Sequence, residues 1–259
     1  MADEGHEHVG HTHKSVEAFG AEHAKLYDSQ AELVMGDRER HRRHLRDLLR
    51  ALPQEPRDFV ELACGTGYFT EVLFEVFPRI SGIAIDGSEA MLQQARARFQ
   101  DATHDLTLRR ELLQTLDWSA VGKTSLVFSA FAVHHISDDE KRSLLRRIFE
   151  HLEPGGAFVL FDMFRPEDPA ADAIIERLAC LEIQRRVQDA RGSAPTLESI
   201  IARDREKKGT EGDQEASVDA HLRWLRETGF DGVTLVFLEN RFGGIVAVKP
   251  RVDTGPPRQ

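Results

Sequence analysis

The chain has 259 residues, of which 41% are hydrophobic and 30% charged, ordinary values for a globular protein with a sizeable core. Its formal net charge of −10 argues against a general nucleic-acid-binding surface, because phosphate contacts require clustered Lys and Arg. An apolar run of about 18 residues and an apolar signal segment are both lacking, and the two cysteines, Cys64 and Cys180, are too few for a disulfide framework. We therefore expect a cytoplasmic protein with no membrane partner.

The N-terminal part divides into a tail and a helical cap. Residues 1–13 are polar without an apolar period, so we expect a flexible tail there. A helical cap is expected over 14–56, where Pro53 and Pro56 end the helical pattern. The tail contains four closely spaced histidines: His6, His8, His11 and His13. Such a group would bind Zn²⁺, Ni²⁺ or Cu²⁺ weakly, so incidental composition is the simpler interpretation and no metal ligand is predicted.

One helix of the cap is crowded with arginines: Arg38, Arg40, Arg42, Arg43, Arg46 and Arg50. Such a run is usually a solvated face whose cations pair with Asp and Glu, and we expect that arrangement here. An acidic substrate that faces this helix is the alternative.

Short apolar strands alternate with helices from residue 57 onward, and we expect one domain over 57–249. Ser137-Asp138-Asp139-Glu140 has the form of a capping box that opens one of these helices. This alternation indicates βαβ units and a parallel sheet. The expected strands cover 58–63, 80–86, 106–110, 125–130 and 157–161.

The alternation breaks after the fifth expected strand. Residues 165–217 contain two or three helical stretches and a polar run, so we expect a helical insertion that folds over the site as a lid. Two strands follow at 232–238 and 241–248, close enough in sequence to form an antiparallel hairpin. Residues 250–259 are expected to be a second flexible tail.

The turn after the first strand has the glycines of a nucleotide site. It reads ELACGTG, and Gly65 and Gly67 permit a sharp turn and a close approach of a ligand to the backbone. Asp86 ends the next strand, where a carboxylate can accept hydrogen bonds from both hydroxyls of a ribose. Strand, turn, helix and acid together indicate an adenosine-containing ligand.

Two features favour S-adenosylmethionine (SAM) over NAD as that ligand. The dinucleotide fingerprint requires a small third residue three positions after the second glycine, where this chain has Thr70. Glu61 lies just before the turn, where a carboxylate would repel a pyrophosphate but would suit the ammonium group of a methionine.

Four segments in order resemble the motifs of class I SAM-dependent methyltransferases, the Rossmann-like methyltransferase superfamily. They are ELACGTG, IAIDGSEAML, FSAFAVHHISD and LEPGGAFVLFD, and Ala63 stands where the family usually has its first glycine. The resemblance implies an α/β fold: a Rossmann-like seven-stranded, mostly parallel sheet with an antiparallel terminal hairpin, N-terminal helices and a helical insertion before the last two strands. It also implies SAM as the cofactor.

The resemblance assigns roles around the adenosine. Asp86 would bind the ribose, Met91 would pack near the adenine, and Glu111 would contact the adenine amino group with Leu112 supplying a backbone contact. The family usually has Gly-Asp where this chain has Arg110-Glu111, so Asp117 is the alternative to Glu111.

Further roles concern the methionine end. Ser129 would lie where backbone carbonyls meet the ammonium group, and Tyr27 resembles a tyrosine that covers SAM in related enzymes, with a packed helix tyrosine as the alternative. The complete predicted cofactor set is Tyr27, Glu61, Ala63, Gly65, Gly67, Asp86, Met91, Glu111, Leu112 and Ser129.

His134 and His135 follow the fourth strand, at the edge where ligands bind, and one of them could take a proton from the acceptor. We expect methyl transfer to O or N of a small-molecule acceptor, with no nucleic acid involved and a homodimer as the candidate assembly. The order of the insertion, the following helix and the hairpin also resembles carboxy-SAM synthases, so a SAM-modifying enzyme is one alternative. A non-catalytic or metal-binding protein on a methyltransferase scaffold is the other.

Overall fold

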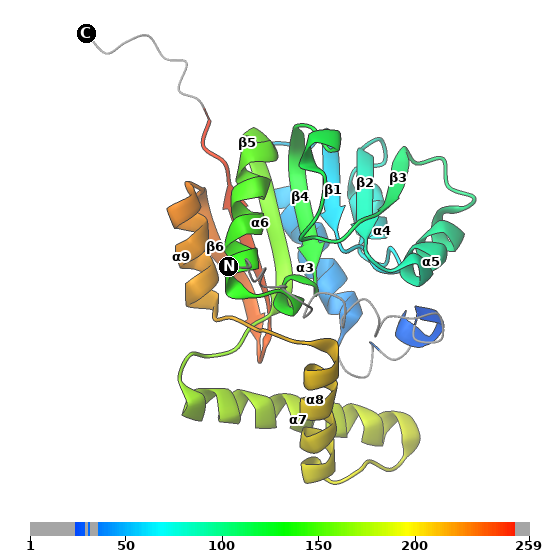
Figure 1. Cartoon of the computed structure of the whole chain (residues 1–259). Coiled ribbons are helices and arrows are strands. Elements are labelled where there is room, and N and C mark those ends of the chain that lie inside the picture. Colours follow the sequence, from blue (N-terminus) through cyan, green and yellow to red (C-terminus); the bar gives the residue numbers. More distant parts are fainter. Residues whose placement is uncertain (1–23, 29–30, 32–35, 252–259) are drawn as a thin grey trace, which may run out of the picture.

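A computed structural model describes residues 24–28, 31 and 36–251. The expected tail at 1–13, most of the cap before residue 36 and the end of the chain from 252 lie outside the described residues. Within these residues, one sheet carries helices on both faces and a pair of helices extends beyond one of its edges (Figure 1). No helix of the described part is long and apolar enough to cross a membrane.

The sheet has seven strands in the order β3-β2-β1-β4-β5-β7-β6. All neighbours are parallel except β7, which runs antiparallel to both β5 and β6, so the predicted parallel sheet with an antiparallel terminal hairpin is confirmed. The strands are β1 (Asp58–Leu62), β2 (Ser81–Asp86), β3 (Leu106–Arg110), β4 (Thr124–Ala130), β5 (Leu152–Met163), β6 (Asp231–Glu239) and β7 (Phe242–Val248).

The central strands are buried on both faces, which explains their continuous apolar runs. β1 and β2 lie close enough that Phe59 packs directly over its register partner Gly82. A Cβ atom at Gly82 would lie 2.1 Å from the Phe59 ring, so only glycine fits at this position.

Helices α3 (Arg38–Ala51), α4 (Thr70–Val76) and α5 (Glu89–Phe99) cover one face of the sheet, and α6 (Asp138–His151) and α9 (Val218–Thr228) cover the other. Ser137 caps α6 through the predicted capping box with Glu140. Two short 3₁₀ turns, η1 (Trp118–Ala120) and η2 (Val133–His135), precede and follow β4. The sheet is therefore the middle layer of a three-layer domain.

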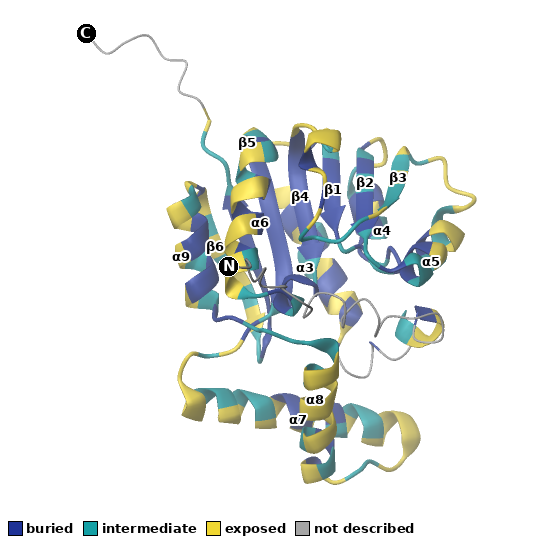
Figure 2. Ribbon diagram, viewed as in Figure 1, coloured by how far each residue is buried: buried dark blue, intermediate teal, exposed yellow. Residues whose placement is uncertain are grey.

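The insertion forms two helices, α7 (Pro169–Arg191) and α8 (Leu197–Glu211), which cross beyond the carboxyl ends of the parallel strands (Figure 1). They share a small core that includes Cys180, and much of their remaining surface is exposed (Figure 2). A buried ion pair ties them to the sheet, because both Asp204 oxygens accept hydrogen bonds from Arg241 at 2.8 and 2.9 Å. The bidentate geometry fixes α8 against the turn between β6 and β7.

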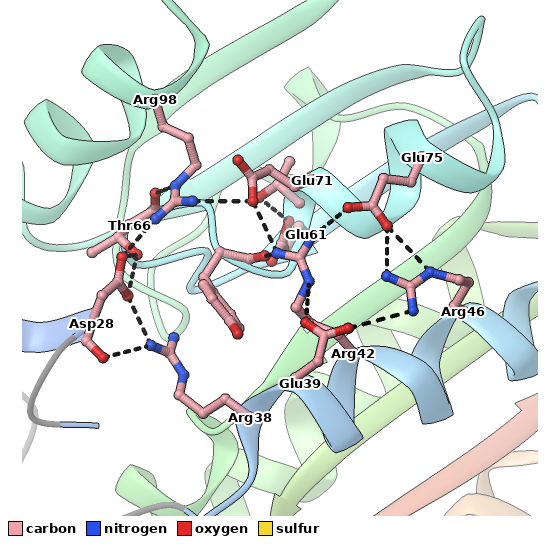
Figure 3. Close-up of polar contacts among 12 residues, drawn as sticks. Asp28, Arg38, Glu39, Arg42, Arg46, Glu61, Thr66, Glu71, Glu75 and Arg98 are labelled. Carbon is pink, nitrogen blue, oxygen red and sulfur yellow. Dashed lines mark hydrogen bonds and ion pairs between the residues drawn. The ribbon is translucent and has the colours of Figure 1, made fainter. Parts of the chain in front are cut away.

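Four arginines of α3 pair with acids of other elements: Arg38, Arg40, Arg42 and Arg46. Figure 3 shows three of them. Arg42 is buried and donates to Glu71 at 2.9 Å, to Glu75 and to the Tyr68 carbonyl at 2.8 Å. Arg46 adds a second contact with Glu75 at 2.8 Å. The expected pairing with carboxylates is present, and it joins α3 to α4 rather than only solvating a helix face.

Replacing Arg42 with Met should lower the free energy of unfolding by about 2 kcal/mol, because charge-assisted hydrogen bonds are lost and their partners are left unpaired. Arg43→Met is the matched control: this side chain is 60% exposed and lies 3.8 Å from its partner Asp37. It should change stability by no more than about 0.5 kcal/mol. Urea denaturation of both variants measures this, and equal losses would contradict the anchoring role of Arg42.

Candidate functional site

A cleft of about 910 Å³, open mouth included, lies at the carboxyl ends of β1, β2 and β4. Its walls are the turns that follow these strands, together with Tyr27 and Arg38 from the N-terminal part. The strand order of this sheet reverses between β1 and β4. In open parallel sheets, ligands bind in the crevice at such a reversal. Eight of the predicted site residues line the cleft: Tyr27, Ala63, Gly65, Asp86, Met91, Glu111, Leu112 and His135.

The turn after β1 needs left-handed backbone at three positions. Ala63, Gly65 and Gly67 have φ of 55°, 57° and 77°. A Cβ at Gly67 would lie 2.6 Å from the Phe99 ring, so this glycine lets α5 pack against the turn, whereas a Cβ at Gly65 would meet nothing within 4 Å. Ala63 adopts a conformation that costs an L-residue about 1–2 kcal/mol. Strain of this kind is typical of ligand-binding turns.

Asp86 connects the turns that follow β1 and β2. Its two carboxylate oxygens accept hydrogen bonds at 2.8 Å, one from the Gly65 N–H and one from the Ser88 N–H. Burial raises the pKa of Asp86, and the two backbone donors oppose that rise. The carboxylate is thereby held in one orientation at the wall of the cleft.

Three of the predicted cofactor residues do not line the cleft: Glu61, Gly67 and Ser129. Glu61 is buried and accepts a hydrogen bond from Thr70 Oγ1 at 2.6 Å. Ser129 is also buried and donates to the Leu62 carbonyl at 3.0 Å. Neither these two residues nor Gly67 is among those that line the cleft. Their contribution to a ligand would be the shape of the backbone turns that they support.

The adenine end predicted from the sequence is formed by Met91, Glu111 and Leu112, which line the cleft together. One Glu111 oxygen pairs with Arg109, and the other accepts a hydrogen bond from the Asp117 N–H at 2.9 Å. Asp117 itself caps η1 by accepting from Ser119 and does not line the cleft. The geometry therefore favours Glu111 over Asp117 as the acid that faces a ligand.

The segment that carries Tyr27 is pinned to the turn after β1. Asp28 accepts hydrogen bonds from Thr66 Oγ1 at 2.9 Å, from Arg38 at 3.0 Å and from Arg98 at 2.6 Å (Figure 3). Burial raises the pKa of Tyr27 to about 12, so its phenol stays neutral at physiological pH. Tyr27 thus lines one side of the cleft with a neutral phenol.

His134 and His135 lie in η2, and only His135 lines the cleft. His134 is held from behind by its Nδ1 contact with Asp162, the acid near the end of β5. Burial alone would lower the pKa of His134, but the carboxylates of Asp162 and Asp213 raise it, whereas burial and the neighbouring His134 lower the pKa of His135. The two histidines therefore differ in their surroundings, and only the ring of His135 lines the cleft.

Several residues of the site were not predicted. Phe131 lines the cleft with a left-handed backbone, φ 55°, directly after β4. Asp162 and Asp213 contact the histidines from β5 and from the segment after α8. An acid at the carboxyl end of a parallel strand was a usable signal for Asp162, whereas the polar run around Asp213 contains no motif.

Comparison with protein families gives a match over residues 59–156 to a family described as a methyltransferase domain. The carboxy-S-adenosyl-L-methionine synthase of Cronobacter sakazakii is 28% identical over 177 residues, which cover 64% of this chain and 64% of the relative. The trans-aconitate 2-methyltransferase of Deinococcus radiodurans is 34% identical over 116 residues, covering 44% and 42%. The chain thus spans less than two thirds of the length of these relatives.

Solved structures agree on the fold. An O-methyltransferase family protein from Burkholderia thailandensis superposes with a TM-score of 0.63 at 15% identity, covering 94% of this chain and 64% of its own. At this identity the similarity concerns the architecture alone.

Glu61 should make stability depend on pH. Burial raises its pKa from 4.5 to about 8, so between these values the folded chain holds a proton that the unfolded chain has released. Stability from this group is therefore full below pH 4.5, falls as the pH rises to 8 and is level above it, a loss on the order of 5 kcal/mol. Glu61→Gln should remove that loss while keeping an oxygen acceptor for Thr70.

The measurement is urea denaturation of both proteins from pH 5 to pH 9. The stability of the natural chain minus that of Glu61→Gln should decrease steadily up to pH 8. A constant difference would mean that Glu61 is ionised throughout.

Proposed function

We propose that this chain, whose residues 59–156 belong to a methyltransferase domain family and whose fold is that of class I SAM-dependent methyltransferases, transfers the methyl group of SAM to oxygen or nitrogen of a small-molecule acceptor. One observation carries the proposal. The Asp86 carboxylate and the left-handed turn at Ala63 and Gly65 meet in one cleft at the carboxyl edge of the sheet. This is the arrangement that binds an adenosyl group in α/β folds.

In this proposal the ligand spans the cleft. Asp86 accepts hydrogen bonds from the ribose hydroxyls, and Met91, Glu111 and Leu112 hold the adenine. The methionine end lies toward β4, where Ala130 and Phe131 line the wall. Tyr27 covers the ligand, while Glu61 and Ser129 support the turns from behind.

A sulfonium methyl group is already activated, so the main requirement is an in-line approach of the acceptor at short range. The acceptor's nucleophilic atom forms a bond to the methyl carbon while the carbon–sulfur bond breaks and sulfur keeps the electron pair. An acceptor hydroxyl or ammonium must also lose a proton. His135 is the candidate to take that proton, because it lines the cleft, and its ring packs 4.0 Å from that of His134.

The net charge of −10 favours a small acceptor over a nucleic acid. Helices α7 and α8 lie beyond the same edge of the sheet and would bound the acceptor. Cytoplasmic residence and a homodimer stay predictions from the sequence.

Carboxy-SAM synthesis is a second candidate, supported by relatives that carry this name. The two candidates differ in their products. A methyltransferase converts SAM to S-adenosylhomocysteine and a methylated acceptor, whereas a carboxy-SAM synthase yields a nucleoside heavier than SAM by a carboxyl group. The protein is incubated with SAM and the small-molecule fraction of a cell extract. Mass spectrometry of the resulting nucleoside then distinguishes the two candidate functions.

Calorimetric titration with SAM, S-adenosylhomocysteine and NAD tests the ligand assignment. We expect both adenosyl ligands to bind and NAD not to bind. Asp86→Asn should weaken SAM binding by about 1–3 kcal/mol, because charge-assisted hydrogen bonds to the ribose are lost. Asp105→Asn, a change at the opposite edge of the sheet, should leave affinity unchanged. Binding of NAD alone would overturn the proposed function, and an unaltered affinity of Asp86→Asn would remove Asp86 from the site.

His135→Gln should lower kcat for methyl transfer by about 10²-fold or more, since assistance with proton removal is lost. SAM affinity should stay within about twofold, because His135 faces the acceptor side. His104→Gln is the control, as this histidine stacks on Phe74 away from the cleft. Steady-state kinetics with an acceptor found by screening measures both effects, and an unchanged kcat would exclude His135 from the transfer step.

A further inference from the structure

Three metal-ligating side chains converge at the wall of the cleft. His134 and His135 come from η2, and Asp213 comes from the segment after α8. Each offers one ligand atom within 4.8 Å of the other two. All three are largely buried, so they are shielded from bulk water but connected to the cleft through His135.

The distances suit a metal ion. Asp213 Oδ1 lies 3.0 Å from His135 Nδ1 and 3.9 Å from His134 Nε2. Bonds of about 2.0–2.2 Å to nitrogen and oxygen put neighbouring ligands roughly 3–3.5 Å apart. The first separation lies in that range and the second is slightly longer, so a small side-chain rotation would complete the site.

The partner of His134 prepares its other nitrogen for coordination. Asp162 is buried and a carboxylate can only accept, so the Nδ1 of His134 carries the proton of this hydrogen bond. In the neutral ring Nε2 then has its lone pair available, and it is Nε2 that faces Asp213. A carboxylate behind a histidine is the usual arrangement at metal sites, where it fixes ring orientation and raises ligand basicity.

The segment that carries Asp213 is fixed on both sides. The Gln214 N–H donates to the His134 carbonyl at 2.6 Å. Lys141 is fully buried and donates to the Gln214 carbonyl and, at 2.7 Å, to the Ile136 carbonyl. The Asp213 N–H in turn bonds the Lys208 carbonyl at the end of α8. The carboxylate is thus presented to the two histidines by backbone contacts and not by chance on a free loop.

We propose that His134, His135 and Asp213 bind a divalent first-row transition metal ion, such as Zn²⁺, Fe²⁺, Mn²⁺ or Co²⁺, at the wall of the cleft. Two imidazoles and one carboxylate select such ions over Mg²⁺ and Ca²⁺, which prefer all-oxygen ligands. Three protein ligands leave at least one coordination position open, as in catalytic metal sites.

The role of this metal site in catalysis rests on the proposed function, whereas its metal binding does not. With the metal bound, His135 would assist proton removal as a ligand and not as the base itself. A hydroxyl of the acceptor would occupy the open position and lose its proton to water more readily. The resulting oxygen would form its bond to the SAM methyl carbon as the carbon–sulfur bond breaks, with the electron pair staying on sulfur.

Cobalt titration of the chelator-treated full chain tests the site. The tail histidines are first replaced together (His6→Ser, His8→Ser, His11→Ser, His13→Ser), because they could bind metal themselves. In this background we expect one Co²⁺ per chain with a visible absorption spectrum. Asp213→Asn should weaken Co²⁺ binding by at least about 100-fold and Asp162→Asn by about 10–100-fold. His151→Gln, at the end of α6, should have no effect.

His135→Cys gives a readout that a purely structural role would not produce. If residue 135 is a ligand, Co²⁺ should show a new thiolate charge-transfer band in the near ultraviolet. The absence of bound Co²⁺ in the tail background, or binding that Asp213→Asn leaves unchanged, would overturn the proposal. Calorimetry with SAM on the metal-free protein is read separately, so failure of the metal site is distinguishable from failure of the proposed function.

Discussion

The shape of the cleft depends on one carboxylate, that of Asp86. Asp86 receives the Gly65 N–H with one oxygen and the Ser88 N–H with the other, so a single side chain fixes the turns of two adjacent strands. A parallel sheet brings these turns to the same edge, but nothing in the sheet itself determines their orientation. The left-handed backbone at Ala63 and Gly65 is the consequence, because the chain must turn sharply to present that N–H. A ligand hydroxyl that donates to Asp86 would therefore meet a carboxylate that is already oriented.

Ion pairs join the N-terminal part of the chain to the elements around the turn after β1. Asp28 gathers Thr66, Arg38 and Arg98, and Arg42 joins α3 to α4 (Figure 3). These contacts run from the N-terminal part to the turn after β1, so the segment that carries Tyr27 and this turn are held together. Exposed ion pairs contribute little to stability, but Arg42 is buried and its partners are held in place. Release of the segment that carries Tyr27 and Asp28 would have to break several charge-assisted hydrogen bonds together.

The sequence predicted the mostly parallel sheet and its terminal hairpin, because both follow from apolar periodicity. It predicted Asp86 from its place after the second strand, and Met91 and Leu112 from the family resemblance, and all three line the cleft. It did not predict Asp213 or Phe131. The first reaches the site through a turn after α8 whose polar composition resembles any surface loop, and contacts over that sequence separation leave no local pattern. The second adopts φ 55° as a phenylalanine, a conformation that propensity assigns to glycine. Tertiary contacts decided both positions.

The insertion is coupled to the histidines more directly than a mobile cover would be. The bidentate contact between Arg241 and Asp204 holds α8 to the sheet, and Lys141 holds the segment after it to η2. A change in the length or sequence of α7 and α8 would therefore be transmitted to the His134–His135 pair through Gln214, which donates to the His134 carbonyl. Under the proposed function, the segment after α8 would both lie near the acceptor and supply the Asp213 carboxylate beside the histidines, so acceptor choice and the geometry of methyl transfer would be coupled.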